Sequence, residues 1–166
     1  MIKIILLVAL FSACGFLGIN VSKIYSEKYN FYKELLTFCK SLKTDISFLK
    51  TDILSIMQKT NFKSKLSNIL DDVKILLTKN TIINKNEFLI SLEKYQFLTE
   101  QDKSCLCLIF CEIGNLGYDE ELSKIEYNIN SVEMLMDDFK QNKLKMATLS
   151  KKMGFLLGFL VCIILI

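Results

Sequence analysis

Two apolar segments, one near each end of the sequence, constrain this chain more than any other feature. Residues 4–19 (IILLVALFSACGFLGI) contain no charge, and with their neighbours they supply the roughly 20 residues that a membrane-spanning helix requires. Residues 153–166 (MGFLLGFLVCIILI) form a shorter run, about 21 Å long as a helix, which snorkelling Lys151 and Lys152 can extend. We therefore expect transmembrane helices at 1–22 and 153–166. For the second segment, a helix that only dips into one leaflet is the alternative.

Small residues recur in both apolar segments at a spacing that allows helices to pack closely. Cys14-x-x-x-Gly18 in the first segment and Gly154-x-x-x-Gly158 in the second follow the small-xxx-small pattern. Glycine is also common in membrane helices in general. The pattern therefore permits a helix–helix contact in the membrane but does not demonstrate one.

Lysines flank the apolar segments unevenly. Those on the inner side of the two segments and close to them are Lys23, Lys28, Lys33, Lys143, Lys145, Lys151 and Lys152. On the outer side stands Lys3. Because loops rich in lysine stay in the cytoplasm, we expect a two-pass protein of the cell membrane with residues 23–152 as a cytoplasmic domain.

Two long stretches of this domain carry apolar residues at steps of three and four. They are Tyr32, Leu35, Cys39, Leu42, Ile46, Leu49, Ile53 and Ile56 in the first stretch, and Leu122, Ile125, Ile129, Val132, Met136, Phe139 and Met146 in the second. This spacing predicts two long helices, each with one apolar edge. In the second stretch the spacing is broken by Lys143. Acidic residues at its start favour a helix over 119–150 that continues into the second apolar segment.

Three shorter helices are expected between the long ones. The first is marked by Leu66, Ile69, Leu70, Val73, Leu76 and Leu77. Asn84 and Thr99 resemble N-caps that open two more, and Asp102 would complete the second cap. Gly114 and Gly117 are expected to end the last short helix, because glycine adopts the left-handed conformation that closes helices. The fold class is therefore all-α: a bundle of about five to six helices whose long first and last helices continue into the membrane segments.

The apolar edges of the long helices admit two interpretations. They can pack within the chain as the core of a bundle, or they can leave an edge for a partner or for a second copy of the chain, giving a homo-oligomer. Both can hold at once, because long helices joined by short ones rarely bury every apolar face.

The composition argues against catalysis and against nucleic acid. The chain has no histidine, so the commonest general base and metal ligand at neutral pH is missing. A net charge of +3 and the absence of arginine argue against nucleic-acid binding. Adjacent carboxylates are expected to be solvated, because neighbours on a helix point about 100° apart. We expect no enzyme, no catalytic residue, no cofactor and no metal site.

Four of the six cysteines lie among apolar residues of the predicted helices. These are Cys39, Cys105, Cys107 and Cys111. Such cysteines are expected to be small buried side chains in a reducing compartment. A zinc site is the alternative, but Cys-x-Cys-x3-Cys without histidine fits the usual ligand spacings poorly.

The order of the segments resembles the stage III sporulation protein AB family of endospore-forming bacteria. The local matches are Leu42-Lys-Thr-Asp45-Ile46-Ser-Phe48, Leu98-x-x-x-Asp102, Gly114-Asn-Leu116-Gly117 and Lys152-Met-Gly154-Phe-Leu-Leu-Gly158. The family often has a Pro-Leu-Pro step after the first of these motifs, whereas this chain has no proline.

The resemblance implies a fold similar to the cytoplasmic F domain of type II secretion and type IV pilus systems. It also implies a non-enzymatic platform in the mother-cell membrane, within the channel complex that links mother cell and forespore. The implied partners are a secretion-type ATPase on the cytoplasmic face, other membrane subunits and the lipid bilayer. The interaction or structural positions to probe are Asp45, Asp102, Gly114, Gly117, Gly154 and Gly158, most of which are expected to be structural.

Two other functions compete with the platform. One is a stand-alone coiled-coil membrane protein, connected with division or encoded by a phage. The other is an extracellular lipoprotein, because Phe11-Ser12-Ala13-Cys14 resembles a lipobox and would place a lipid on Cys14.

Overall fold

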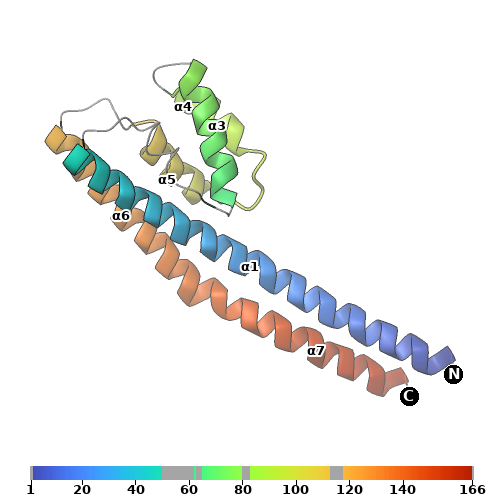
Figure 1. Ribbon diagram of the computed structural model, residues 1–166. Coiled ribbons are helices and arrows are strands. Elements are labelled where there is room, and N and C mark those ends of the chain that lie inside the picture. Colours follow the sequence, from blue (N-terminus) through green and yellow to red (C-terminus); the bar gives the residue numbers. More distant parts are fainter. Residues whose placement is uncertain (1, 50–61, 63–64, 80–82, 113–117, 166) are drawn as a thin grey trace. The chain divides into compact units, whose positions relative to one another are not determined.

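The computed structural model describes residues 2–49, 62, 65–79, 83–112 and 118–165. Its elements are α1 (Ile2–Leu49), α3 (Lys65–Lys79), α4 (Lys85–Leu92), α5 (Glu100–Phe110), α6 (Tyr118–Phe139), the π-helical turn η1 (Lys140–Leu144) and α7 (Lys145–Leu165) (Figure 1). Among these described residues there is no strand, which confirms the predicted all-α fold class. The three short helices expected between the long ones correspond to α3, α4 and α5.

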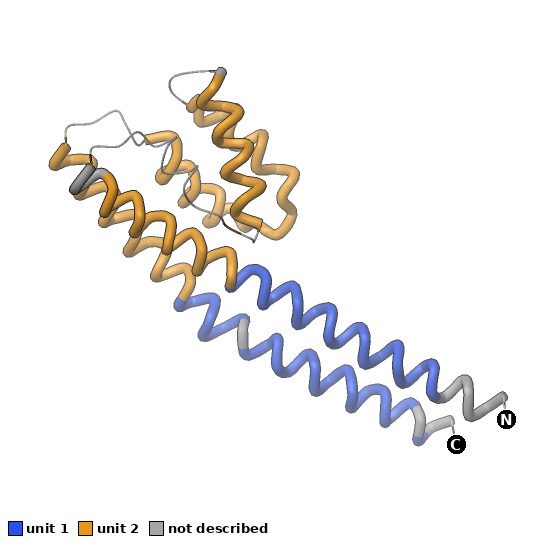
Figure 2. The backbone as a smooth tube through the Cα atoms, in the orientation of Figure 1, with its two compact units in different colours: residues 1–29, 137–166 blue, residues 30–136 orange. Residues whose placement is uncertain are grey.

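The chain divides into two compact units. Unit 1 comprises residues 1–29 and 137–166, and unit 2 comprises residues 30–136 (Figure 2). Unit 1 thus combines both apolar segments, which lie at opposite ends of the sequence. The division expected at residues 22 and 152 concerns the membrane boundary and stays a prediction.

In unit 1 the N-terminal part of α1 and the helix α7 lie side by side (Figure 2) and pack through glycine backbones. A Cβ atom on Gly18 would lie 2.7 Å from the carbonyl oxygen of Ser150. A Cβ atom on Gly154 would lie 2.9 Å from the carbonyl oxygen of Cys14 and 3.1 Å from the Cα atom of Gly18. These distances leave no room for a side chain, so the two backbones are in direct contact. This is the packing that the small-residue spacing permits.

Aromatic rings extend this contact along the two helices. The ring of Phe11 lies 6.1 Å from that of Phe155 and 5.2 Å from that of Phe159, measured between centroids. A Cβ atom on Gly158 would lie 2.8 Å from the Phe11 ring. Gly158 is therefore the position where an aromatic side chain of α1 sits against the backbone of α7.

The π-helical turn η1 changes which face of α7 points toward α1. With α-helical spacing, Met146 is expected on the same edge as Phe139, seven residues earlier. Instead Met146 is 49% exposed and its neighbour Ala147 is 5% exposed. A π turn inserts one residue into a helix, so the buried position moves on by one. The prediction for Met146 was wrong for this reason, and the break in the spacing at Lys143 falls within the turn itself.

Many large apolar side chains of unit 1 are exposed, whereas small residues are buried at its helix contact. The exposed ones are Val8, Phe16, Leu17, Ile19, Val21, Ile24, Met146, Leu149, Met153, Phe155, Leu156, Leu157, Phe159, Leu160 and Ile163. The buried small residues are Gly15, Gly18, Ser22, Ala147, Gly154 and Gly158. Soluble proteins rarely expose so many apolar side chains next to one another. By length and composition, the segment Val8–Asp45 of α1 is able to cross a membrane, and these features indicate membrane association.

Unit 2 encloses an apolar core to which all its helices contribute. Its fully buried large side chains are Phe31, Phe38, Phe88, Leu35, Leu42, Leu66, Ile69, Leu92, Leu106 and Ile109. At the centre the Phe110 ring lies 5.6 Å from that of Phe38 and 5.9 Å from that of Phe88. Burying one such ring stabilises the fold by about 1.5–3 kcal/mol.

The buried residues of α1 and α6 confirm the core interpretation of both apolar edges within the described part of unit 2. They include Tyr32, Leu35, Cys39 and Leu42 from the first edge and Ile125, Ile129 and Val132 from the second. The remaining side chains of the first edge, those of Ile46, Leu49, Ile53 and Ile56, lie outside the described part.

Ion pairs join α1 to α6 at the surface of unit 2. Lys40 Nζ lies 2.8 Å from Glu133 Oε1, and Lys43 Nζ lies 3.0 Å from Glu126 Oε1. The later lysine pairs with the earlier glutamate, so the two helices run antiparallel. Exposed pairs of this kind contribute about 0–1 kcal/mol each. The two ion pairs therefore add little to the stability of unit 2, but they are consistent with the register between α1 and α6.

Both predicted N-caps are present. The Asn84 side chain accepts a hydrogen bond from the Asn86 backbone N–H at 3.0 Å. The Thr99 hydroxyl accepts from the Asp102 N–H at 3.3 Å, and the Asp102 carboxylate accepts from the Thr99 N–H at 2.7 Å. Because each cap satisfies donors that the helix leaves unpaired, Asn84 and Thr99 fix where α4 and α5 begin.

Replacing a contact glycine with alanine tests the packing of unit 1. Gly18→Ala should destabilise the chain by about 1–3 kcal/mol, because the new methyl group meets the Ser150 carbonyl oxygen. In thermal unfolding of the purified chain in detergent micelles, followed by circular dichroism, this corresponds to a melting temperature lower by about 2–4 °C per kcal/mol. Leu157→Ala, on the outward face of α7, is the control. Equal melting temperatures for the two variants would contradict the contact.

Candidate functional site

The residues singled out in the sequence occupy different parts of the chain. Asp45 and Asp102 belong to unit 2, and Gly154 and Gly158 line the helix contact of unit 1. Gly114 and Gly117 lie outside the described residues. Of the candidates in unit 2, Asp102 is the one that the fold buries.

Asp102 is a buried carboxylate in the first turn of α5. Tyr32 of α1 donates its hydroxyl to Asp102 Oδ1 at 2.5 Å, and the Thr99 backbone N–H donates to Oδ2 at 2.7 Å. The start of the helix also favours negative charge through its dipole. Burying a carboxylate costs several kcal/mol unless such bonds compensate. Asp102 therefore anchors the start of α5 against α1, which is a structural role.

The sequence pattern identifies the cap at Asp102 but not its partner Tyr32. A cap involves residues three apart, so it can be read locally, whereas Tyr32 lies 70 positions away. Tyr32 also occupies an apolar position of the first long helix, where a tyrosine is indistinguishable from an ordinary core residue.

Asp45 does not share this site. It is half-buried on α1, more than three helical turns beyond Tyr32. That separation is about 20 Å along the helix axis, well beyond the reach of a hydrogen bond to Asp102.

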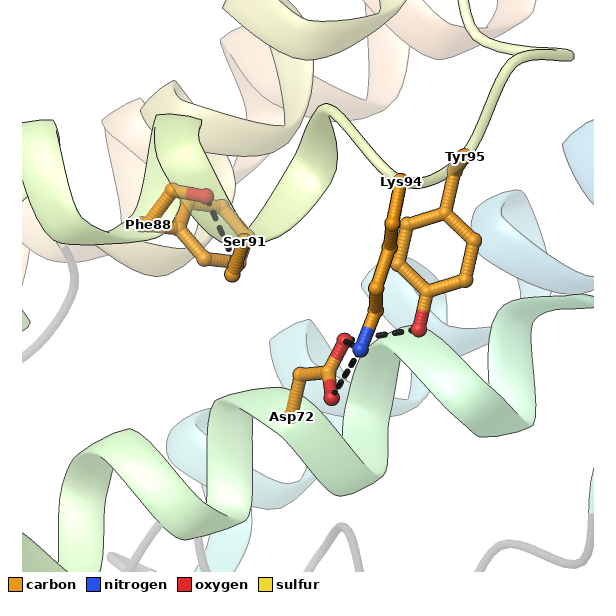
Figure 3. Close-up of polar contacts among 5 residues, drawn as sticks. All are labelled: Asp72, Phe88, Ser91, Lys94 and Tyr95. Atoms are coloured by element: carbon orange, nitrogen blue, oxygen red, sulfur yellow. Dashed lines mark hydrogen bonds and ion pairs between the residues drawn. The ribbon is translucent and has the colours of Figure 1, made fainter.

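A second polar contact centres on Asp72 of α3 and is not marked by any sequence pattern (Figure 3). Lys94 Nζ lies 2.7 Å from the Asp72 carboxylate, and the Tyr95 hydroxyl donates to Asp72 Oδ2 at 2.6 Å. Burial and the Asp72 carboxylate raise the pKa of Tyr95 above its usual value, so its hydroxyl remains a donor at neutral pH. In the same view Ser91 donates to the Phe88 carbonyl oxygen at 2.7 Å. The bonds of Lys94 and Tyr95 to Asp72 hold the turn after α4 onto α3, whereas the Ser91 bond lies within α4.

The adjacent carboxylates of α3 behave differently from each other. Asp71 is exposed and pairs with Lys74 at 3.1 Å, as expected for a solvated residue. The same expectation was wrong for Asp72, because its carboxylate ties α3 to the next segment. Acid–base catalysis needs two carboxylates across a cleft, whereas these two are neighbours on one helix. The described residues also contain no group of three or more side chains suited to hold a metal ion.

The cysteines of unit 2 are free thiols within or beside its core. Burial raises the pKa of Cys39 to about 12 and that of Cys105 to about 11. Burial and the neighbouring Cys107 raise the pKa of Cys111 to about 12. Cys107 and Cys111 line a partly open cavity of about 330 Å³. Thiols that stay protonated are weak nucleophiles and weak metal ligands, which agrees with the prediction of small buried side chains.

Removing either partner of the buried bond tests the role of Asp102. Tyr32→Phe should lower the free energy of unfolding by about 1.5–3 kcal/mol, because a hydrogen bond to a charged group is lost. Asp102→Ala should cost more, since the cap is lost as well. A double-mutant cycle by chemical denaturation should give a coupling of at least about 1 kcal/mol between the two positions. Additive effects would contradict the bond.

The raised thiol pKa values predict slow alkylation and loss of stability in alkali. At pH 8 the native thiols Cys39 and Cys105 should react with iodoacetamide roughly 100-fold more slowly than unfolded thiols, whose pKa is about 8.5. Because the folded state holds these protons more tightly, their contribution to stability is complete below about pH 8.5 and is lost as the pH rises toward the folded values. Mass spectrometry measures the alkylation, and denaturant unfolding between pH 8 and 11 measures the stability. Equal labelling of native and unfolded chains would contradict the burial.

Comparison with known families accounts for almost the entire chain. The family model of stage III sporulation protein AB matches residues 3–166, which include both apolar segments and every helix between them. Searches of curated proteins and of solved structures return no match. The chain therefore belongs to the stage III sporulation protein AB family.

Proposed function

We propose that this sporulation protein is a non-enzymatic platform that crosses the mother-cell membrane twice and presents unit 2 to the cytoplasm. There it docks a secretion-type ATPase and other membrane subunits of the channel complex between mother cell and forespore. The observation that carries the proposal is the inverted polarity of unit 1, whose apolar side chains point outward around a glycine contact. Such a surface is stable in lipid and costly in water.

The pairing of the helices in unit 1 supports a second membrane crossing. Gly154 faces Gly18, and Gly158 faces Phe11, so α7 and α1 run antiparallel. If this register continues for another two turns, the apolar end of α7 reaches the level of the first residues of α1. The shorter apolar segment then extends as deep into the bilayer as its longer partner, which argues against a helix confined to one leaflet.

The distribution of lysines supports the proposed orientation. Lysines crowd the inner side of both segments, and the cytoplasm retains positively charged loops. An uncleaved first segment also agrees with the contacts of Phe11, which precedes Cys14 and packs against Phe155, Gly158 and Phe159 of α7. A lipoprotein would lose the residues before Cys14.

The outer face of α6 is the part of unit 2 that best suits a protein partner. Tyr127 and Met134, seven residues apart on one face of the helix, are 62% and 73% exposed. Tyrosine and methionine are enriched where proteins meet. A shallow depression beside Tyr127 is lined by Asp119, Glu120, Ser123 and Lys124. This surface combines apolar and charged groups in the way that a docking site requires.

Capture from gently solubilised membranes of sporulating cells tests the platform. The tagged chain should recover a cytoplasmic secretion-type ATPase together with small membrane proteins. The double variant Tyr127→Ala, Met134→Ala should recover at least about tenfold less ATPase, since truncating the central side chains of an interface costs about 2 kcal/mol or more and about 1.4 kcal/mol is tenfold. Ile90→Ala, an exposed apolar residue of α4, is the matched control and should recover the normal amount.

Other results of the capture would favour the competing functions. Recovery of the chain alone, with none of these proteins, would support a stand-alone membrane protein. If mass spectrometry showed that the purified chain begins at a diacylated Cys14, the chain would be a lipoprotein. The proposed orientation would then be reversed.

A further inference from the structure

We propose that the lysine-rich segment 140–152 of unit 1 binds the headgroups of anionic phospholipids at the inner membrane surface. The segment comprises η1 and the start of α7. Its sequence, KQNKLKMATLSKK, contains five lysines and no acidic residue. This inference rests on the proposed membrane insertion of unit 1.

The lysines of this segment differ in their surroundings from six lysines in the described part of unit 2. In unit 2, Lys40, Lys43, Lys74, Lys94, Lys103 and Lys124 each pair with a carboxylate. In the described part of the chain, no carboxylate lies within ion-pair distance of Lys140, Lys143, Lys145, Lys151 or Lys152. All five are exposed. Five positive charges on about three and a half turns of helix repel one another unless an outside anion neutralises them.

The acidic groups described in unit 1, Glu27, Asp137 and Asp138, are fewer than the five lysines of this segment. Asp138 accepts a hydrogen bond from the Asn142 side chain at 2.6 Å. Asp137 is exposed at the end of α6, and Glu27 lies on α1 beside Lys28. Together with Lys23, these neighbours leave the region with a clear excess of positive charge.

The same segment presents apolar side chains between its lysines. Met146 and Leu149 are exposed, and on α1 Ile24 is exposed next to Lys23. Exposed apolar residues alternating with lysines are typical of helices that lie at a lipid headgroup boundary. An acidic protein partner would account for the lysines. It would not explain why the exposed apolar groups among them continue into the exposed apolar face of α7. A lipid surface provides the anion and the apolar boundary together.

The position of Lys151 and Lys152 along the paired helices is also consistent with binding to lipid headgroups. Lys151 Cα lies 3.5 Å from the position of a Cβ atom on Gly18, so Lys151 and Lys152 are level with the apolar part of α1. Their side chains must extend along the helix to reach the headgroups, as snorkelling lysines do. Phosphate groups of anionic lipids are then the nearest negative charges available to them.

The test measures lipid selectivity of the full chain in phosphatidylcholine vesicles. Spin-labelled phosphatidylglycerol and spin-labelled phosphatidylcholine are compared by electron spin resonance for their association with the protein. We expect a preference of about fivefold for phosphatidylglycerol at low salt, equivalent to one lysine contact of about 1 kcal/mol. The preference should disappear near 1 M salt, where the Debye length is about 3 Å.

Lysine-to-glutamine variants test whether the preference for phosphatidylglycerol arises from segment 140–152. Lys151→Gln, Lys152→Gln should reduce it, and adding Lys140→Gln, Lys143→Gln and Lys145→Gln should remove it. The control Lys74→Gln, Lys85→Gln removes two charges from unit 2 and should leave the preference unchanged. If the variant with all five substitutions kept the preference of the unmodified chain, the inference would be overturned. Equal association of both lipids with the unmodified chain would also overturn it.

Two further measurements separate this inference from its alternatives. Inorganic phosphate added at constant ionic strength should not change the preference; if it abolishes it, the segment binds free phosphate and not lipid. Alkaline carbonate extraction of the same vesicles reports membrane insertion. Loss of the chain into the extract would overturn the proposed two-pass function and this inference with it. Retention of the chain without lipid preference would overturn this inference alone.

Discussion

Direct contact between the backbones at Gly18 and Gly154 is the constraint on which the rest of unit 1 depends. Inside a lipid bilayer the hydrophobic effect does not bring helices together, so close packing must supply the attraction. Glycine allows this approach because it has no side chain. A Cβ atom on Gly18 or Gly154 would lie 2.7 or 2.9 Å from the facing carbonyl oxygen, so no other residue fits without a shift. With small residues inward, the large apolar side chains of two segments from opposite ends of the sequence are left to face outward.

Unit 2 is built by the opposite rule. Phenylalanine and leucine side chains are buried at its centre, and several of its lysines pair with carboxylates at the surface. Its buried polar groups are compensated, as Asp102 is by Tyr32 and by the cap of α5. One chain therefore contains a part with many outward-facing apolar side chains and a part whose apolar side chains form a core. α1 belongs to both, because its sequence changes from an uninterrupted apolar run to a helix with one apolar edge.

The features that could be predicted from the sequence are those set by neighbouring residues. The caps at Asn84 and Thr99 and the apolar spacing of α3 depend on residues within a few positions of each other. The contacts that escaped prediction join distant parts of the chain, such as Tyr32 with Asp102 and Asp72 with Tyr95. The face of α7 was misjudged at Met146 because the π turn adds one residue, and the interruption at Lys143 was the visible sign of it. Gly18, Gly154 and Gly158 were identified by spacing, but the structure was needed to show that Gly154 faces Gly18 and that Gly158 faces Phe11.

The platform that we propose for this member of the stage III sporulation protein AB family has its folded body on the cytoplasmic side of the membrane. Protease added to sealed membrane vesicles tests this most directly. In inverted vesicles, whose cytoplasmic face is outside, residues 30–136 should be digested and fragments containing the two membrane segments should remain protected. In right-side-out vesicles the same residues should stay intact. Digestion of residues 30–136 in right-side-out vesicles would contradict the account.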